Sequence, residues 1–278
     1  MRKMLYTFAC LTLTAALFVL TGCGGDASGG GSKKAVDSSD STSSMSAVDA
    51  IKKRGVLTLA TGTYVPFEFR DEKTNEIIGF DVDFAQLIAD KLEVDLKVTD
   101  MDFKSIVPSV QKGDYDIAIA AMYDTPERRE QVLMSDSYMS TGMVLVAPKG
   151  NPKKITSLAD CDSLVVGYKV GGTSEKVALE AMEEHEITFV QKGYDETVGH
   201  AMDLEAGRVD VVVNDLLNQM ELNKTFLEQE IITEPFTEAD LSIAVKKGNE
   251  DLLKLINDLI KEYKEDGTYE ELYKKWIE

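Results

Sequence analysis

Apolar residues alternate between two spacings along most of the chain, and the alternation predicts strands and helices in turn. A continuous apolar run at 56–60 predicts a buried strand, and residues 81–92 place their apolar side chains at helical spacing. The other expected strands are 95–99, 116–121, 142–147, 163–168, 187–192, 209–213 and 241–246. The other expected helices are 105–111, 127–131, 157–160, 175–184, 195–206, 216–228, 250–265 and 269–277.

This order of elements predicts an α/β protein of two lobes. Alternating strands and helices are typical of parallel sheets with helices on both faces. The pattern restarts after 142–147 and returns at 241–246, so we expect two strands to cross between the lobes. The expected lobe 1 is 47–142 plus 243–278, and the expected lobe 2 is 143–242, including the hinge strands.

The expected ligand site lies beyond the strand ends. In open α/β sheets, ligands bind outside the carboxyl ends of the strands. The segments that follow the apolar runs are 61–64, 121–124, 169–173 and 214–215.

The first 46 residues have a different composition. Arg2 and Lys3 precede an apolar stretch that ends in Leu20-Thr21-Gly22-Cys23. The stretch is shorter than the ~20 residues of a membrane-spanning helix and is typical of an export signal. Its ending resembles the bacterial lipobox, so we expect a lipoprotein signal peptide at 1–22 and lipidation of Cys23; a plain secretory signal is the alternative. Residues 23–46, rich in Gly and Ser, predict a flexible tether.

Charge and composition exclude several function classes. The net charge of −19 argues against nucleic acid or an anionic membrane surface as a partner. Cys161 would be the only cysteine left unmodified after export, so we expect no disulfide and a buried, inert thiol. We expect His185 and His200 on helix surfaces, with a pocket position as the alternative for His200. No metal or nucleotide motif is present, so we expect no metal and no cofactor.

Several short motifs resemble the polar amino-acid-binding proteins of ABC importers, the bacterial extracellular solute-binding proteins of family 3. They are Tyr64-Val65-Pro66-Phe67-Glu68-Phe69, Ile78-Gly79-Phe80-Asp81-Val82-Asp83, Thr125-Pro126-Glu127-Arg128, Ala206-Gly207-Arg208-Val209-Asp210 and Asp266-Gly267-Thr268-Tyr269, with Lys274-Lys275-Trp276 as the terminal motif. The resemblance spans 47–278. It implies a two-lobed, type II periplasmic-binding-protein-like fold. It also implies a monomer, anchored by lipid outside the cytoplasm, that closes over a free amino acid and presents it to a permease.

The resemblance also implies roles for particular residues. A buried zwitterion needs partners for both charges. Arg128 matches the carboxylate clamp, since a guanidinium fork fits two oxygens. Asp215 matches the acceptor of the amino group. Thr173, with the turn 171–173 at a helix start, matches a second anion contact. Tyr64 and Phe103 match rings that stack on the ligand side chain, and Ala121, Tyr123 and Lys169 complete the expected site. The structural alternatives are a surface Arg128, helix caps at Thr173 and Asp215, and core packing of the two rings.

Three departures from the family pattern bear on specificity. The stretch 61–63 lacks the acid that many relatives place there, which disfavours lysine, arginine and histidine as ligands. Tyr123 replaces a Ser or Thr, and its neighbour Asp124 either faces solvent or replaces the missing acid. Lys169 either favours an amide or acid side chain or is solvated. We therefore expect a neutral or acidic polar amino acid, such as glutamine, cystine or glutamate.

Two other functions compete with transport. Exported cyclohexadienyl dehydratases resemble this family, but such an enzyme needs a general acid in the cleft, for which Asp124 is the candidate. A ligand-sensing or adhesive surface lipoprotein is the other alternative.

Overall fold

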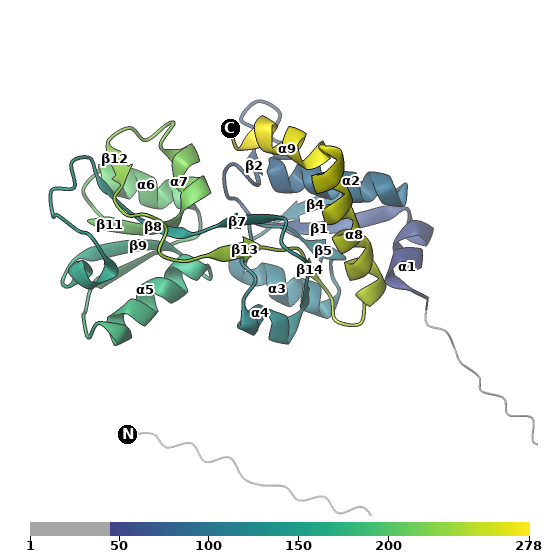
Figure 1. The fold of residues 1–278 in the computed structure, drawn as a ribbon, viewed down its shortest axis with the longest axis horizontal. Helices are drawn as coiled ribbons and strands as arrows, with labels where there is room; N and C mark the ends of the chain where they lie inside the picture. Colours follow the sequence, from purple (N-terminus) through teal and green to yellow (C-terminus); the bar gives the residue numbers. More distant parts are fainter. Residues whose placement is uncertain (1–44) are drawn as a thin grey trace, which may run out of the picture. The chain divides into compact units, whose positions relative to one another are not determined.

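The computed structural model describes residues 45–278, which form a mixed α/β structure (Figure 1). The expected signal peptide, Cys23 and almost all of the expected tether lie outside the described residues. Within 45–278, no helix is both long and apolar enough to cross a lipid bilayer.

The first sheet has five strands in the order β4-β1-β5-β14-β6. They are β4 (Asp95–Asp100), β1 (Val56–Thr61), β5 (Ile117–Ala118), β14 (Ala244–Val245) and β6 (Leu133–Met134). β1 runs parallel to β4 and β5, whereas β14 is antiparallel to β5 and β6.

The second sheet has the order β10-β9-β11-β8-β12. Its strands are β10 (Val190–Tyr194), β9 (Val165–Lys169), β11 (Val211–Asp215), β8 (Met143–Pro148) and β12 (Gln229–Ile231). β9 is parallel to β10 and β11, but β8 is antiparallel to β11 and β12. The expectation of parallel sheets was therefore wrong in part. β8 and β14 enter their sheets directly from the connecting segments, without a crossover helix that would reverse their direction.

Two short strands connect the sheets. β7 (Met139–Thr141) and β13 (Ala239–Leu241) pair antiparallel between them (Figure 1). The expected crossing strands at 142–147 and 241–246 begin three and two residues after β7 and β13 begin. Residues 143–147 belong to the sheet strand β8, and 241–246 contains the last residue of β13 and the whole of β14. Gly142 is required here, since a Cβ at this position would lie 2.2 Å from the Thr237 carbonyl oxygen.

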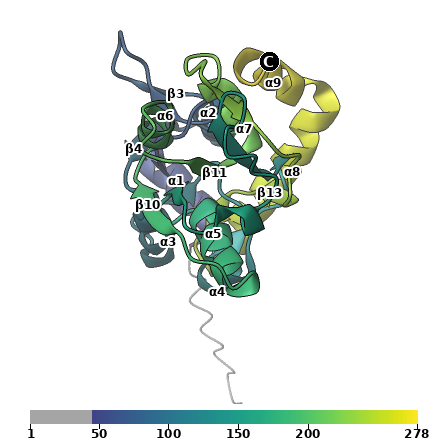
Figure 2. The ribbon, with the colours of Figure 1, turned by 90° about the vertical axis from the view of Figure 1, so that its left-hand side faces the viewer.

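Helices cover both faces of each sheet. In the first, α2 (Phe80–Leu92) and α3 (Phe103–Lys112) lie on opposite faces (Figure 1). In the second, α5 (Thr173–Glu184) and α6 (Thr197–Glu205) do the same (Figure 2). The remaining helices are α1 (Ala47–Arg54), α4 (Pro126–Gln131), the 3₁₀ helix η1 (Leu158–Cys161), α7 (Leu216–Leu222), α8 (Glu250–Asp266) and α9 (Thr268–Trp276).

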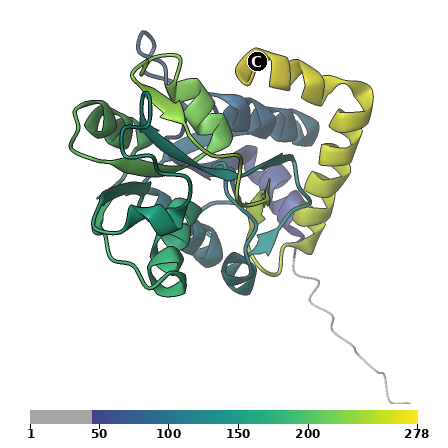
Figure 3. The same ribbon diagram turned by 60° about the vertical axis from the view of Figure 1, so that its left-hand side comes forward.

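The C-terminal helices pack beside the first sheet and the helix α2 that covers it. α9 packs against α2, where Figure 3 shows the yellow helix pair beside it. The rings of Tyr269 and Phe80 meet edge to face at 5.7 Å between centroids. Asp83 accepts a hydrogen bond from the Trp276 indole at 2.7 Å. These contacts explain why the terminal motif with Trp276 belongs to the fold.

Several elements differ from the expectations. α1, the hairpin of β2 (Phe69–Arg70) and β3 (Ile77–Ile78), and β12 were not expected. The expected strand 116–121 pairs only at 117–118, because the chain then turns into the site and Ala121 has φ 44°. The expected helix 216–228 ends at Leu222 in a turn. His200 is fully buried rather than on the helix surface, and burial lowers the pKa of its imidazole to about 3.

The expectations for Cys161 and His185 were correct. Cys161 is fully buried, and this burial raises the pKa of its thiol to about 12. The thiolate, which is the reactive form, is therefore rare at neutral pH. His185 is exposed, at the C-terminal end of α5.

Candidate functional site

A small cavity lies where the strand ends of both sheets meet, and it collects residues from distant parts of the chain. Seven of the eight expected ligand contacts line it: Tyr64, Phe103, Ala121, Tyr123, Arg128, Lys169 and Thr173. Ala120, Met143, Gly172 and Ser174 complete the lining. The eighth expected residue, Asp215, is reached through the Tyr123 hydroxyl. The structure thus brings the expected residues together; that they bind a ligand stays a prediction.

Arg128 is held at the start of α4. Pro126 opens this helix, and the Thr125 hydroxyl caps it by accepting from the Arg128 amide at 3.3 Å. The guanidinium donates to the Tyr123 carbonyl at 2.5 Å and lies 5.3 Å from the centre of the Phe103 ring. Desolvation lowers the pKa of Arg128 to about 10, against the opposing field of Glu127 and Asp124.

In the described part of the chain, the neighbouring arginine, Arg129, is exposed and ion-paired, unlike Arg128. Arg129 points outward and forms an ion pair with Asp124, whose carboxylate also accepts from its Nε at 2.7 Å. Asp124 does not line the cavity, so it does not replace the acid that is missing from 61–63. It does not stand free in solvent either, because it is the partner of Arg129. Arg128, in contrast, forms no ion pair with any residue of 45–278.

The start of α5 faces the same cavity. Gly172 is the N-cap residue without a side-chain hydrogen bond, and Thr173 is the first helical residue. Thr173 is therefore not the cap, which was the structural alternative for it. The first N–H groups of a helix have no acceptor within the helix and carry its positive dipole end. Together with Arg128, they make this end of the cavity suited to a carboxylate.

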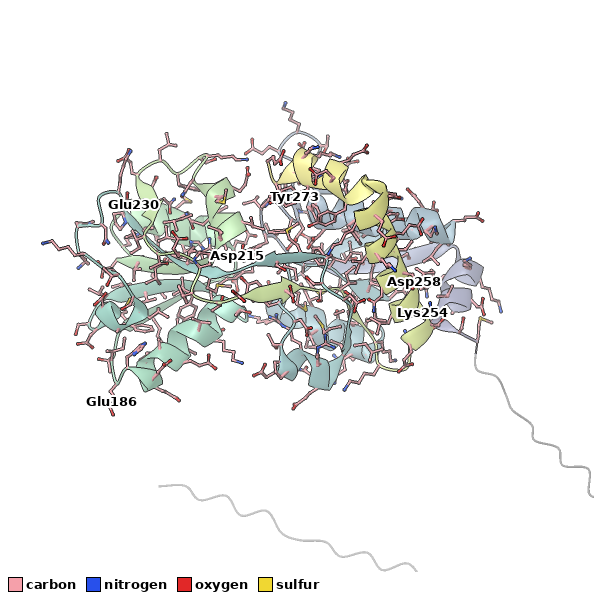
Figure 4. All side chains as sticks on the ribbon, in the orientation of Figure 1. Glu186, Asp215, Glu230, Lys254, Asp258 and Tyr273 are labelled. Carbon is pink, nitrogen blue, oxygen red and sulfur yellow. The ribbon has the colours of Figure 1, made fainter. Side chains whose placement is uncertain are left out.

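Asp215 ends β11 and begins α7. One carboxylate oxygen caps α7 by accepting from the amides of Leu217 at 2.9 Å and Asn218 at 3.3 Å. The other accepts the Tyr123 hydroxyl at 2.5 Å. Asp215 is 2% exposed, and burial raises its carboxyl pKa although these hydrogen bonds oppose the shift. It therefore caps the helix and also contacts the Tyr123 side chain that lines the cavity; Figure 4 shows it in the interior, away from the peripheral Glu186.

Lys169, the last residue of β9, also lines the cavity. It is 7% exposed, so it is not the solvated lysine of the structural alternative. Its Nζ donates to the carbonyls of Asp195 at 2.8 Å and Thr63 at 3.3 Å. It also lies 5.5 Å from the centre of the Tyr64 ring. Burial lowers its pKa, and Glu68 has the strongest effect among the acids that oppose this shift.

Direct contacts join the two halves of the site. The Tyr64 hydroxyl donates to Asn214 at 3.2 Å, and the Asn218 amide donates to the Val65 carbonyl at 2.5 Å. Gly171, with φ 73°, lets the chain approach Lys104, since an added Cβ would lie 3.0 Å from that side chain. Sequence reasoning placed 214–215 beside the site but gave Asn214 no role of its own. It did not single out Met143, which lies in an apolar run without a polar signal.

No cluster of His, Cys, Asp and Glu within the described part of the chain could hold a metal ion. The site therefore has to be interpreted from its fixed charges, rings and backbone donors, which suit a small molecule carrying both signs of charge.

These features define a class: a two-lobed protein with a small cavity, lined by charged and aromatic residues, where the two sheets meet. The chain belongs to the bacterial extracellular solute-binding proteins, family 3, whose model matches residues 57–278. This is the family of amino-acid-binding proteins that serve ABC transporters.

Named relatives bind different amino acids. The chain is 31% identical over 282 residues to the glutamine-binding protein GlnH of Bacillus subtilis (99% of this chain, 97% of the relative). It is 30% identical over 232 residues to the L-cystine-binding protein TcyJ of Escherichia coli K12 (83% and 85%). A solved ancestral arginine-binding protein bound to arginine is 38% identical, with a TM-score of 0.76 (81% of this chain, 99% of that one). The two-lobed type II fold of these proteins is thus the fold of this chain.

Proposed function

We propose that this protein captures a free polar amino acid with a neutral or acidic side chain, such as glutamine, glutamate or cystine. The observation that carries the proposal is the distribution of buried charge around the cavity. Arg128 and Lys169 are cations that form no ion pair among residues 45–278, and Asp215 is a buried carboxylate without a cationic partner there. A buried charge without a partner is costly, so a ligand that supplies the partners gains what the empty site lacks.

Each part of an amino acid then has a place. Its α-carboxylate would accept from Arg128 and the first amides of α5, and its ammonium would donate to Asp215 beside the Tyr123 hydroxyl. Tyr64 and Phe103 would flank the side chain, whose far end would meet Lys169. Because Arg128 precedes β7 and Asp215 follows β8, the ligand would bridge both lobes and favour their closure.

Lys169 is the reason to prefer a neutral or acidic ligand over arginine. A second cation placed 4 Å from its Nζ would cost on the order of 4 kcal/mol at an effective dielectric constant of about 20. An amide oxygen or a carboxylate would instead accept a charge-assisted hydrogen bond. The relatives, which bind glutamine, cystine and arginine, support a free amino acid as the ligand. The choice among amino acids rests on Lys169.

We extend the proposal to the rest of the chain. Residues 1–22 would direct export, Cys23 would carry the lipid, and 23–46 would tether a monomer to the outer face of the cell membrane. The lobes would be 47–142 with 243–278, and 143–242. The closed, loaded form would deliver its amino acid to the membrane subunits of an ABC permease. Fatty-acid labelling that is lost in Cys23→Ala would test the anchor.

Calorimetric titration with the twenty amino acids and L-cystine tests the function. We expect one ligand class, neutral or acidic, to bind with one-to-one stoichiometry. Tight binding of arginine or lysine would refute the specificity, and no binding by any of these compounds would refute the proposal as a whole.

An enzyme related to cyclohexadienyl dehydratase is the second candidate. It would need an acid with a raised pKa facing the cavity, and Asp124, the expected candidate, pairs with Arg129 outside it. Glu68 has a raised pKa but does not line the cavity. The pKa of Asp215 is also raised, but its carboxylate accepts from the α7 amides and the Tyr123 hydroxyl, which is the arrangement of a charged acceptor and not of a proton donor. Release of product from prephenate or arogenate, followed by NMR, would favour the enzyme instead.

A further inference from the structure

Two acidic side chains lie fully buried behind the cavity, and the proposed function does not use them. Glu68 and Asp81 are both 0% exposed. Both oxygens of Glu68 and Oδ1 of Asp81 have no hydrogen-bond partner if both groups are ionised. No Lys, Arg or His of residues 45–278 forms an ion pair with either. Two adjacent buried carboxylates in this state would be strongly unfavourable.

The two carboxyl groups are within hydrogen-bonding reach of each other. One proton satisfies two of these three oxygens, because a protonated Glu68 donates its O–H to the free Oδ1 of Asp81, and it leaves the remaining Glu68 oxygen uncharged. Two buried carboxyl groups within hydrogen-bonding distance cannot both be ionised, and such pairs share one proton. Burial and then the charge of Asp81 raise the pKa of Glu68 well above its ordinary value. Burial raises the pKa of Asp81 to about 6, although hydrogen bonds from Ala121, Tyr138 and Glu68 oppose the shift.

Asp81 is connected to the wall of the cavity. Its Oδ2 accepts from the Ala121 amide at 2.7 Å and from the Tyr138 hydroxyl at 3.1 Å. Ala121 lines the cavity with φ 44°, a left-handed conformation that costs a non-glycine residue about 1–2 kcal/mol. The Asp81 hydrogen bond therefore holds Ala121 in a conformation that it would not adopt alone.

Glu68 is connected to the same wall from the other side. Its backbone pairs with Tyr64 in both directions, at 2.6 Å and 3.0 Å. A Cβ added to Gly62 would lie 3.8 Å from its Oε1, so the carboxyl group lies behind the segment that leads to Tyr64. The pair thus spans the gap between the two segments that supply Tyr64 and Ala121.

We propose that Glu68 and Asp81 share one proton in a carboxyl–carboxylate hydrogen bond, and that this pair positions Ala121 and Tyr64 for ligand binding. The positioning role rests on the proposed amino-acid site, whereas the shared proton does not. The titratable groups that face the pair are Tyr64, Tyr138, Lys169 and, through Tyr138, Tyr269. Lys169 is the single cation among them and is too far away to form an ion pair with Glu68.

The shared proton is tested without ligand. Infrared spectra of the purified protein at pH 7.5 should show the C=O band of a buried protonated carboxyl group, which Glu68→Gln should lose. Glu68 takes up a proton on folding, so the unfolding constant of the wild type should rise with pH above the ordinary Glu pKa. Glu68→Gln, whose amide can donate to Asp81 at every pH, should reduce this dependence by up to tenfold per pH unit. Absence of the infrared band, or an unchanged pH slope in Glu68→Gln, would overturn the shared proton.

The positioning role is tested with L-glutamine, L-glutamate and L-cystine as probes. Glu68→Gln should bind the wild type's preferred probe within about threefold of the wild type. Glu68→Leu leaves Asp81 Oδ1 without a donor and should weaken binding at least tenfold while the protein stays folded by circular dichroism. Equal affinity in all three proteins would overturn the positioning role. If no probe binds even the wild type, the proposed function fails, and the infrared and unfolding results still decide the shared proton.

Discussion

Replacing Arg128 by alanine tests the carboxylate end of the site. Arg128 is partly buried without an ionic partner among the described residues, and its guanidinium is already oriented by the Tyr123 carbonyl and the Phe103 ring. A ligand carboxylate would accept two charge-assisted hydrogen bonds from the fork, each contributing about 1.5–3 kcal/mol. Their loss, about 3–6 kcal/mol, corresponds to a Kd increase of roughly 10²–10⁴-fold at about 1.4 kcal/mol per decade.

The chain offers a matched control for this experiment. Arg129 is the next residue in the same helix, but it points outward to Asp124. Calorimetry with the wild type's ligand should show Arg129→Ala within about fivefold of the wild type, since exposed ion pairs contribute about 0–1 kcal/mol. Arg128→Lys should fall between, because an ammonium keeps the charge and loses the fork. Binding by Arg128→Ala within threefold of the wild type, with normal thermal unfolding, would refute the carboxylate clamp.

Three further predictions concern single residues. Asp215→Asn keeps an oxygen to cap α7 but loses the charge. The Kd measured by calorimetry should therefore rise at least tenfold while the Tm changes by only a few degrees. Weaker binding accompanied by a large fall in Tm would mean a purely structural role. Lys169→Met should weaken glutamate more than glutamine, by about tenfold or more in the ratio of their Kd values, and an unchanged ratio would contradict contact with the side chain. His200 is buried with its pKa near 3, so the unfolded chain protonates first and this contribution to stability is lost as pH falls from about 6.5 towards 3. Denaturant unfolding should therefore give a shallower pH dependence for His200→Leu than for the wild type in that range, and equal slopes would contradict it.

The order of elements was predictable because apolar spacing records which side of each element is buried. The segments 81–92 and 250–265 show this best, with both ends of their helices within a residue or so of the expectation. Direction within a sheet is not recorded in the same way. β8 and β14 are apolar runs like any other, so their antiparallel pairing depends on how the connecting strands enter each sheet.

The residues around the cavity were found by their family pattern more than by physical signals. Arg128 and Arg129 are adjacent residues of the same type. Only the position of Thr125 and Pro126 at the start of α4 indicates which side chain points inward and which points outward. Ala121 gave no sign of its left-handed backbone, because alanine rarely adopts it. Glu68 lies between two phenylalanines, and this was a signal that could have identified it as a buried acid.

The central claim is that Arg128 and Asp215 hold the two charged groups of one amino acid between the lobes. A crystal structure of the protein with the ligand selected by calorimetry tests it most directly. We predict the α-carboxylate within hydrogen-bonding distance of the Arg128 guanidinium and the ammonium within hydrogen-bonding distance of the Asp215 carboxylate. A ligand bound elsewhere, or bound here with its ammonium directed away from Asp215, would contradict the account.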